Sequence, residues 1–325
     1  MSEPFAPVAS YGNVTGEYQA LHEGAGMVRG YRSLLWVRGS DAVSFLDGQV
    51  SQDIAAMKPG AVARSFLLEP RGKLVALLWI LRGDEDVGLI TETTRVDESV
   101  EALNRFRFRV AAAIGEPVPL TELWGPAATT VLEAAGFSVR PREWVDAGGA
   151  LVASLSESPT VVVIAGDKDD ALVSAGAVPV GLLAATTVRI EWGEPVMGID
   201  VDEATIPQES GLVDQSVSFT KGCYVGQELV ARIDSRGRVN RHLRGLTVTE
   251  NVIPSVGAAV ELDGEAVGTV TSVGESLLLR APIAMAMLRR EVEPGSAVTV
   301  RWDGGRTTAT VRELPMLPSA PDEQA

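Results

Sequence analysis

The chain has 325 residues, 46% of them hydrophobic, and its 28 basic and 43 acidic residues give a formal net charge of −15. This length predicts two or three domains with real hydrophobic cores. The negative charge disfavours extensive binding to nucleic acid or anionic membrane, and a single cysteine excludes an internal disulfide and a paired-cysteine metal clamp.

The N-terminal segment and the apolar runs lead us to expect a soluble cytoplasmic protein. Residues 1–12 lack a basic stretch followed by an apolar core, so no secretory signal is expected. The longest charge-free apolar stretches, Leu74–Leu81 and Ala175–Val188, are shorter than the roughly 20 residues needed to cross a bilayer. A lone thiol also fits a reducing cytosol.

Strands and helices are interleaved in the first half of the chain. Apolar or alternating runs predict strands at Ser33–Val37, Ala63–Leu68, Leu74–Leu81, Val87–Thr91 and Thr160–Ile164. Ser40 can cap a helix over Asp41–Leu46, and Asp97 can cap one from Glu98 to about Phe106. Because no regular strand–helix–strand repeat links these elements, we expect an α+β fold rather than a doubly wound sheet.

After Asn240 the chain becomes rich in short β segments. They lie at His242–Thr249, Ala258–Leu262, Ala266–Val273, Ala297–Trp302 and Thr307–Glu313, with turn signals at Asp263-Gly264 and Asp303-Gly304-Gly305. This spacing predicts a small all-β barrel or sandwich. Residues 314–325 have the composition of a disordered tail.

The only cysteine, Cys223, lies in the segment Lys221–Glu228, which reads KGCYVGQE. Gly222 permits a tight turn, and apolar residues at helical spacing predict a helix that begins near Tyr224. Cys223 would then lie at a helix N-terminus close to Lys221, where an ionised thiolate is favoured. The alternative is a small buried apolar residue, which most free cysteines are.

This segment resembles the signature of the YgfZ-type folate-binding proteins, which share a superfamily with the aminomethyltransferase (T-protein) of the glycine cleavage system. Three further blocks resemble the family in the same order, at Val37–Gln49, Arg189–Glu209 and Val267–Ser272. The resemblance implies two α+β lobes around a central cavity and a C-terminal antiparallel β-barrel. The bilobal folate-binding region would span residues 1–240, with a second lobe at roughly 50–120, and the barrel would span residues 241–313, before the tail.

The resemblance implies tetrahydrofolate or a derivative as the bound ligand and no stable metal. Glu191 matches the glutamate that binds the pterin in the T-protein; the alternative is a solvated acid on a strand. Glu194 is a second candidate. Trp192 and Tyr224 offer aromatic faces to the ligand or belong to the core. The remaining candidates for ligand binding are Lys221, Gly222, Cys223, Gly226, Gln227 and Glu228, and Lys221 and Cys223 are also the candidate catalytic residues.

The catalytic block of the T-protein is altered in this chain. The family carries a pair of aspartates on a hairpin of the first lobe, and one of them is the catalytic acid. Ala76 and Leu77 stand at the matching positions, and neither can transfer a proton. We therefore expect no aminomethyltransferase activity.

Resemblance to the YgfZ-type branch implies a tetrahydrofolate-binding protein that supports assembly or repair of iron–sulfur clusters in client enzymes, including enzymes that modify tRNA. Cys223 would be a nucleophile, a redox centre or a transient cluster ligand. Two alternatives remain, a folate-dependent aminomethyl- or methyltransferase and a non-catalytic interaction scaffold. The expected partners are folate and iron–sulfur enzymes or cluster carriers. We expect no binding to a membrane.

Two arginine-rich segments stand out in this acidic chain. The first comprises Arg232, Arg236, Arg238, Arg241 and Arg244, with Asp234 as the only acid among them. These arginines indicate a local contact with phosphate, polyglutamate or RNA, or else pairing with acids of another domain. In the second, Arg105–Val110, a two-residue alternation predicts an extended segment with three guanidiniums on one face. That face would line the cavity or cover an exposed edge.

Overall fold

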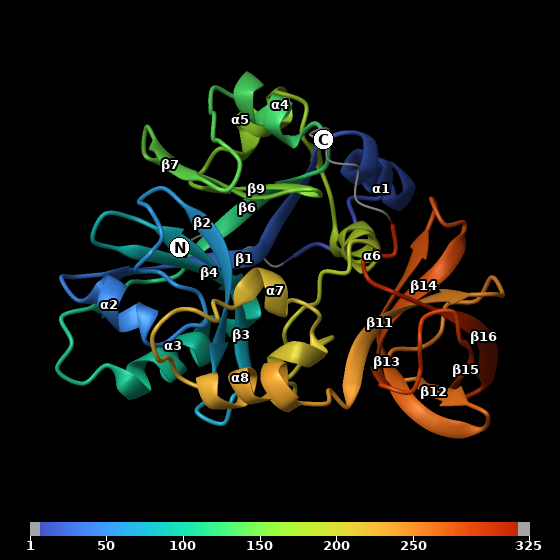
Figure 1. Ribbon diagram of the computed structural model, residues 1–325. Coiled ribbons are helices and arrows are strands. Elements are labelled where there is room, and N and C mark those ends of the chain that lie inside the picture. The colour runs from blue at the N-terminus through green and yellow to red at the C-terminus, as the bar shows by residue number, and fades with distance from the viewer. Residues whose placement is uncertain (1–6, 318–325) are drawn as a thin grey trace, which may run out of the picture.

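The computed structural model describes residues 7–317, and a ten-stranded sheet runs through the first two thirds of the chain (Figure 1). The main path of the sheet is β2-β3-β4-β1-β6-β9-β8-β7, and β5 and β10 pair with β1 beside this path. The strands are β1 (Gly26–Arg38), β2 (Val62–Leu68), β3 (Leu74–Arg82), β4 (Val87–Glu92), β5 (Ala113–Ile114), β6 (Val118–Trp124), β7 (Trp144–Ala147), β8 (Ala150–Glu157), β9 (Thr160–Ala165) and β10 (Val178–Pro179).

Strand β1 is shared by two lobes. One lobe contains β2, β3 and β4, and the other contains β6, β9, β8 and β7. The register of β1 against β6 shifts between Arg29 and Ser33, where Gly30 has a left-handed φ of +66°. Such a bulge bends a strand and increases its twist, which lets one strand serve two lobes.

Each lobe buries one face of its strands under two helices. In the first lobe, α2 (Ala42–Asp47) and α3 (Val96–Phe106) cover a core that includes Ile80 and Leu89. In the second, α4 (Ala128–Ala134) and α5 (Asp169–Ser174) cover a core that includes Leu123 and Ile164. The burial of these apolar side chains drives each layer together.

A third core lies where the two lobes face α1 (Val14–Glu23) and α6 (Leu182–Glu191). Asn13 caps α1 by accepting a hydrogen bond from the backbone N–H of Gly16 at 3.0 Å. After α6 come the short helices η2 (Pro207–Glu209), α7 (Val213–Ser216) and α8 (Gln227–Arg236), and η1 (Thr93–Arg95) precedes α3.

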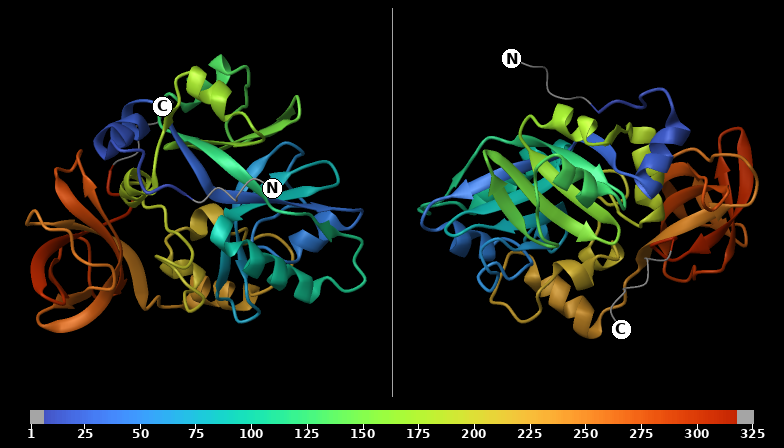
Figure 2. Two further views of the ribbon diagram at one scale, coloured as in Figure 1. Left: turned by 180° about the vertical axis from the view of Figure 1, so that it is seen from behind. Right: turned by 90° about the horizontal axis from the view of Figure 1, so that it is seen from above.

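The C-terminal strands form a closed barrel in the order β11-β14-β13-β12-β15-β16. They are β11 (Arg241–Val248), β12 (Ala259–Leu262), β13 (Glu265–Ser276), β14 (Ala281–Arg289), β15 (Ala297–Trp302) and β16 (Gly305–Arg312). The barrel packs against the rest of the chain through α6, which contacts β13 and β14 (Figures 1 and 2).

The predicted fold class is confirmed: two α+β lobes and a closed antiparallel barrel are present. The turn at Asp263-Gly264 has the two positive φ angles, +51° and +85°, that a tight hairpin requires. Strand β14 was not predicted, because it is buried on both faces, by the barrel interior and by α6, and so shows no alternation.

Four local predictions differ from the structure. Helix α2 begins after Asp41 rather than after Ser40, and α3 begins at Val96, ahead of Asp97. The extended segment predicted at Arg105–Val110 is wrong, because α3 continues through Phe106 and a loop follows. The helix predicted near Tyr224 begins only at Gln227.

The segment after the barrel returns to the lobes. The backbone N–H of Met316 donates to the carbonyl of Glu191 at 2.8 Å. Residues 314–317, the first part of the predicted tail, therefore pack against the end of α6, and residues 318–325 lie outside the described residues. None of the helices in residues 7–317 combines the length and apolar character of a membrane span.

Candidate functional site in the central cavity

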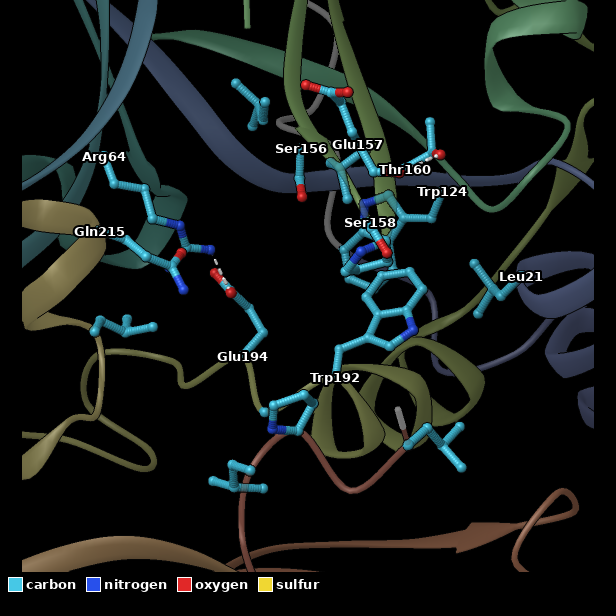
Figure 3. A pocket seen from close by; sticks show the side chains of 18 of the residues that line it. Leu21, Arg64, Trp124, Ser156, Glu157, Ser158, Thr160, Trp192, Glu194 and Gln215 are labelled. Atoms are coloured by element: carbon cyan, nitrogen blue, oxygen red, sulfur yellow. Dashed lines mark hydrogen bonds and ion pairs between the residues drawn. The ribbon is translucent and has the colours of Figure 1, made fainter. Parts of the chain in front are cut away.

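A cavity of about 710 Å³ lies between the two lobes and the barrel. Its walls come from α1, from strands β1, β2, β3, β6, β8, β9 and β11, from the loop after α6, and from the segment 210–215 that leads into α7. Leu278, Leu314, Pro315 and Leu317 also line the cavity. This volume lies within the usual range of about 300–1,000 Å³ for small-molecule sites. Figure 3 shows Arg64 and Glu194 on one side of the cavity and the indole rings of Trp124 and Trp192 on the other, with Glu157 above the rings.

The charged side is built around Glu194. Its carboxylate accepts a hydrogen bond from Arg64 of β2 and a longer one, at 3.5 Å, from Arg32 of β1 (Figure 3 shows the Arg64 contact). Arg32 also donates to Glu122 at 2.7 Å. Burial raises the pKa of Glu122, while the charge of Arg32 opposes the shift. These two hydrogen bonds use two of the roughly four acceptor positions of the Glu194 carboxylate.

The aromatic side is built from tryptophans. The rings of Trp124 and Trp192 lie 5.3 Å apart at a tilt of 44°, and both line the cavity (Figure 3). Trp79 lies under the guanidinium of Arg64 at 4.4 Å from ring centroid to Cζ. This arrangement offers apolar ring faces beside a carboxylate, which suits a flat ligand with a polar edge.

Glu191 does not line this cavity. It is fully buried at the end of α6, where its carboxylate accepts hydrogen bonds of 2.6 Å from the hydroxyl of Tyr18 and from Nε2 of His22. The alternative of a solvated acid on a strand is wrong. His22 does line the cavity, so Glu191 fixes the orientation of a wall residue.

A buried ion pair holds the loop that carries Trp192 and Glu194. Arg189 of α6 donates to Asp200 at 2.6 Å, and its second nitrogen donates to Ser272 of the barrel at 2.6 Å. Asp200 in turn accepts a hydrogen bond from the backbone N–H of Val196. The block Arg189–Glu209 therefore fixes the loop after α6 against the barrel.

The segment Lys221–Glu228 lies outside the lining of the cavity. Lys221 Nζ donates to the carbonyls of Asp47, Val50 and Gln52 at 2.5, 3.0 and 2.7 Å. Burial lowers the pKa of Lys221, and the carboxylate of Asp47 partly opposes the shift. The ammonium group thus fastens this segment to the loop after α2.

The other members of the segment divide between core and surface. Tyr224 is buried among apolar side chains, and burial raises its pKa to about 12. Gly222 is exposed with open space around its Cα, and Gln227 and Glu228 begin α8.

Gly226 has a left-handed φ of +82° and lies against the hairpin between β2 and β3. A Cβ at Gly226 would lie 2.7 Å from the carbonyl oxygen of Glu69. This left-handed residue is also the N-cap of α8, which explains why the helix starts later than predicted.

Cys223 is exposed and lies three residues before that N-cap. The alternative of a small buried apolar residue is wrong. Among the described residues, no group of three histidine, cysteine or acidic side chains has the arrangement of a metal site. The thiol is thus accessible on the surface, on a segment anchored by Lys221.

The hairpin of the first lobe carries no acid at the altered block. Ala76 is fully buried in the core beneath α2 and α3. Leu77 is partly buried and lines a smaller cavity beside Arg32. Neither side chain can donate or accept a proton.

The arginines near the start of the barrel take different partners. Arg241 forms a two-pronged pair with Glu209 at 2.9 and 3.0 Å, which matches the predicted pairing with an acid from outside the barrel. Arg232 and Arg238 are exposed. Arg244 lines the central cavity, and its Nε is buried without a hydrogen-bond partner among residues 7–317.

Several wall residues were not predicted from the sequence, namely His22, Arg32, Arg64, Trp79 and Trp124. A usable signal existed for Arg64, because it is the only charged residue in the run that forms the largely apolar strand β2. A cation inside a buried strand requires a partner. The sequence could not identify Glu194 as that partner.

Comparison with known proteins agrees with this architecture. Residues 241–317 match the glycine cleavage T-protein C-terminal barrel domain. An aminomethyltransferase of Nostoc sp. is 26% identical over 95% of this chain and 89% of its own length, and that of Thermus thermophilus is 28% identical over 95% and 91%.

The crystal structure of glycine cleavage system aminomethyltransferase T from Bartonella henselae has the same fold, with a TM-score of 0.85 at 23% identity over 94% of this chain and 89% of that one. The matched barrel domain, the relatives along almost the whole chain and the shared fold support the assignment of this chain to the superfamily of the glycine cleavage T-protein.

Proposed function

We propose that the chain is a tetrahydrofolate-binding protein of the YgfZ type, and that its ligand occupies the central cavity. The observation that carries this proposal is the carboxylate of Glu194 beside the indole of Trp192 in one cavity of about 710 Å³. Reduced folate has a flat ring with an amidine-like edge, and such an edge can donate two charge-assisted hydrogen bonds to a carboxylate. The names of the relatives are consistent with a folate ligand.

Within this proposal, Glu194 rather than Glu191 contacts the ring. The side chain of Glu194 is 21% exposed on the cavity, whereas that of Glu191 is 0% exposed and is engaged by Tyr18 and His22. Trp192 supplies a ring face, and Glu191 acts through His22. Arg32 and Arg64 hold the carboxylate of Glu194 in place through their hydrogen bonds.

Calorimetric titration with tetrahydrofolate tests the ligand. We expect one saturable site in the wild-type protein and a loss of affinity of about 10- to 100-fold in Glu194→Gln, because a charge-assisted hydrogen bond is replaced by a weaker one. The matched comparison is Glu191→Gln, which should lose less affinity than Glu194→Gln, because Glu191 acts only through His22. Absence of saturable binding to the wild-type protein would reject the proposal.

We further propose that the protein supports the assembly or repair of iron–sulfur clusters in client enzymes, including tRNA-modifying ones. Two observations support this role: the KGCYVGQE segment resembles the YgfZ-type signature, and Cys223 is exposed. Replacing Cys223 by Ala should leave folate binding unchanged and lower the activity of iron–sulfur enzymes in cells. Unchanged enzyme activity would remove the thiol from the proposed role.

Aminomethyl transfer is the second candidate function, because the relatives are named aminomethyltransferases. It would need an acid in place of Ala76 and Leu77. An assay for folate-dependent release of ammonia or formaldehyde separates the two functions, and we expect no release.

A further inference from the structure

Arg244 differs from its neighbour Arg241 on the same barrel strand. Arg241 is paired through both prongs with Glu209. Arg244 forms no ion pair or hydrogen bond with the residues that the structure describes, and its Nε is shielded from solvent without an acceptor. Of these two arginines of β11, Arg241 has a carboxylate partner among the described residues and Arg244 does not.

A guanidinium in this state is unfavourable for the protein alone. A shielded N–H donor without an acceptor loses its hydrogen bonds to water and gains nothing in return. The two N–H groups at the end of an arginine side chain match the two oxygens of a carboxylate. Arg241 binds the carboxylate of Glu209 in this way. Burial lowers the pKa of the nearby His242, and the positive charge of Arg244 lowers it further. The charge of Arg244 is therefore felt by a neighbouring side chain.

The position of Arg244 points to a ligand rather than to another protein. Arg244 lines the central cavity from the barrel wall, together with Leu243. The Arg64–Glu194 pair lines the same cavity from β2 and from the loop after α6. The cavity therefore presents a neutralised carboxylate on one wall and an uncompensated guanidinium on another.

We propose that Arg244 binds a carboxylate of the ligand in the central cavity. The ligand then lies with its flat ring at Trp192 and Glu194 and with its acidic end at β11. This orientation rests on the proposed function, since tetrahydrofolate carries its carboxylates on the glutamate at the end opposite the ring. In this orientation, Arg244 favours the binding of folates, which carry carboxylates, over pterins that lack them.

The test compares two ligands that differ only at the glutamate end. Tetrahydrofolate and its glutamate dimethyl ester share the ring and the spacer, but the ester lacks both carboxylates. Calorimetry should show the wild-type protein binding the free acid about 10- to 100-fold more tightly than the ester, as expected for a charge-assisted pair. Arg244→Gln should bind the two ligands equally, at the affinity of the wild-type protein for the ester.

Two further variants complete the test. Arg232→Gln removes an exposed arginine of α8 and should keep the preference for the free acid. Arg244→Lys keeps the charge without the fork and should retain part of the preference. Because it preserves a long cationic side chain, it also covers the case in which Arg244→Gln fails to fold.

The outcomes are distinguishable. If the wild-type protein binds neither ligand, the proposed function fails. If it binds both equally, or if Arg244→Gln keeps the preference for the free acid, the assignment of Arg244 is overturned while folate binding stands.

Discussion

Arg189 and Asp200 form an ion pair of 2.6 Å across the loop that carries Trp192 and Glu194, and their side chains are only 3% and 0% exposed. The pair also reaches the barrel, because Ser272 donates to Asp200 and accepts from Arg189. A single buried network therefore sets the position of the cavity wall relative to the barrel. These two residues belong to the sequence block that contains Glu191, and their role is to fix the loop.

Replacing Asp200 by Asn should destabilise the protein by about 3–5 kcal/mol, because Arg189 would remain buried without its counter-charge. Urea unfolding measures the loss. The control is Arg301→Met, which breaks an exposed pair with Glu261 on the barrel and should change stability little. An Asp200→Asn variant as stable as the control would show that the pair does not fix the loop.

Replacing Gly226 by Ala should destabilise the protein more than replacing Gly136 by Ala. Both glycines have left-handed φ angles, +82° and +89°, so both variants pay a strain of about 1–2 kcal/mol. Only Gly226 adds a steric overlap, because its new Cβ would lie 2.7 Å from the carbonyl oxygen of Glu69, whereas nothing lies within 4 Å at Gly136. Equal unfolding midpoints in urea would refute the close packing of α8 on the β2–β3 hairpin.

Replacing Lys221 by Met should destabilise the protein by about 1–3 kcal/mol, because carbonyls of the loop after α2 lose a charged donor. The anchor of the Cys223 segment would loosen as well, and the thiol should react faster with iodoacetamide. Folate affinity should change little, since Lys221 lies outside the cavity lining. A stable Lys221→Met variant with lost folate binding would instead make Lys221 a ligand residue.

Much of the fold follows from sequence pattern. Five of the ten sheet strands, β1, β2, β3, β4 and β9, and five of the six barrel strands follow alternation or short apolar runs, and the Asp263-Gly264 turn follows from its residue types. The sheet strands β5, β6, β7, β8 and β10 were not predicted. The pattern fails for β14, which is covered on both sides. It also fails for Arg105–Val110, where two-residue alternation continues past the end of a helix and has no structural meaning.

The site was less predictable than the fold. Glu191 and Glu194 are three residues apart, and only the end of α6 and the turn after it decide which carboxylate faces the cavity. Arg32 and Arg64 meet at Glu194 from strands that are not neighbours in the sheet. These contacts depend on the curvature of the sheet, and no local sequence pattern predicts that curvature.

Replacing Arg244 by Gln should raise the pKa of His242 towards its ordinary value of 6.5, because burial and then the charge of Arg244 hold it lower. In the wild-type protein the unfolded chain takes up this proton at higher pH than the folded chain does. The stability of the folded protein therefore rises as the pH increases from the lowered pKa of folded His242 to 6.5, its ordinary value. In the variant, the pKa of folded His242 lies closer to 6.5, so this pH range should be narrower.

NMR titration of the imidazole protons measures this pKa, and since the chain has two histidines, a His22→Gln variant assigns the signals. Saturation with tetrahydrofolate should shift His242 in the same direction as Arg244→Gln, because a bound carboxylate would neutralise the guanidinium. No shift in either case would mean that the charge of Arg244 does not reach His242.

A crystal structure of the protein grown with tetrahydrofolate would show directly whether the central cavity holds the ligand. We expect ligand density in the central cavity, with the ring against Trp192, its edge on Glu194 and its glutamate at Arg244. Density for the ligand at the Cys223 segment, or anywhere else with the central cavity left free, would contradict this expectation.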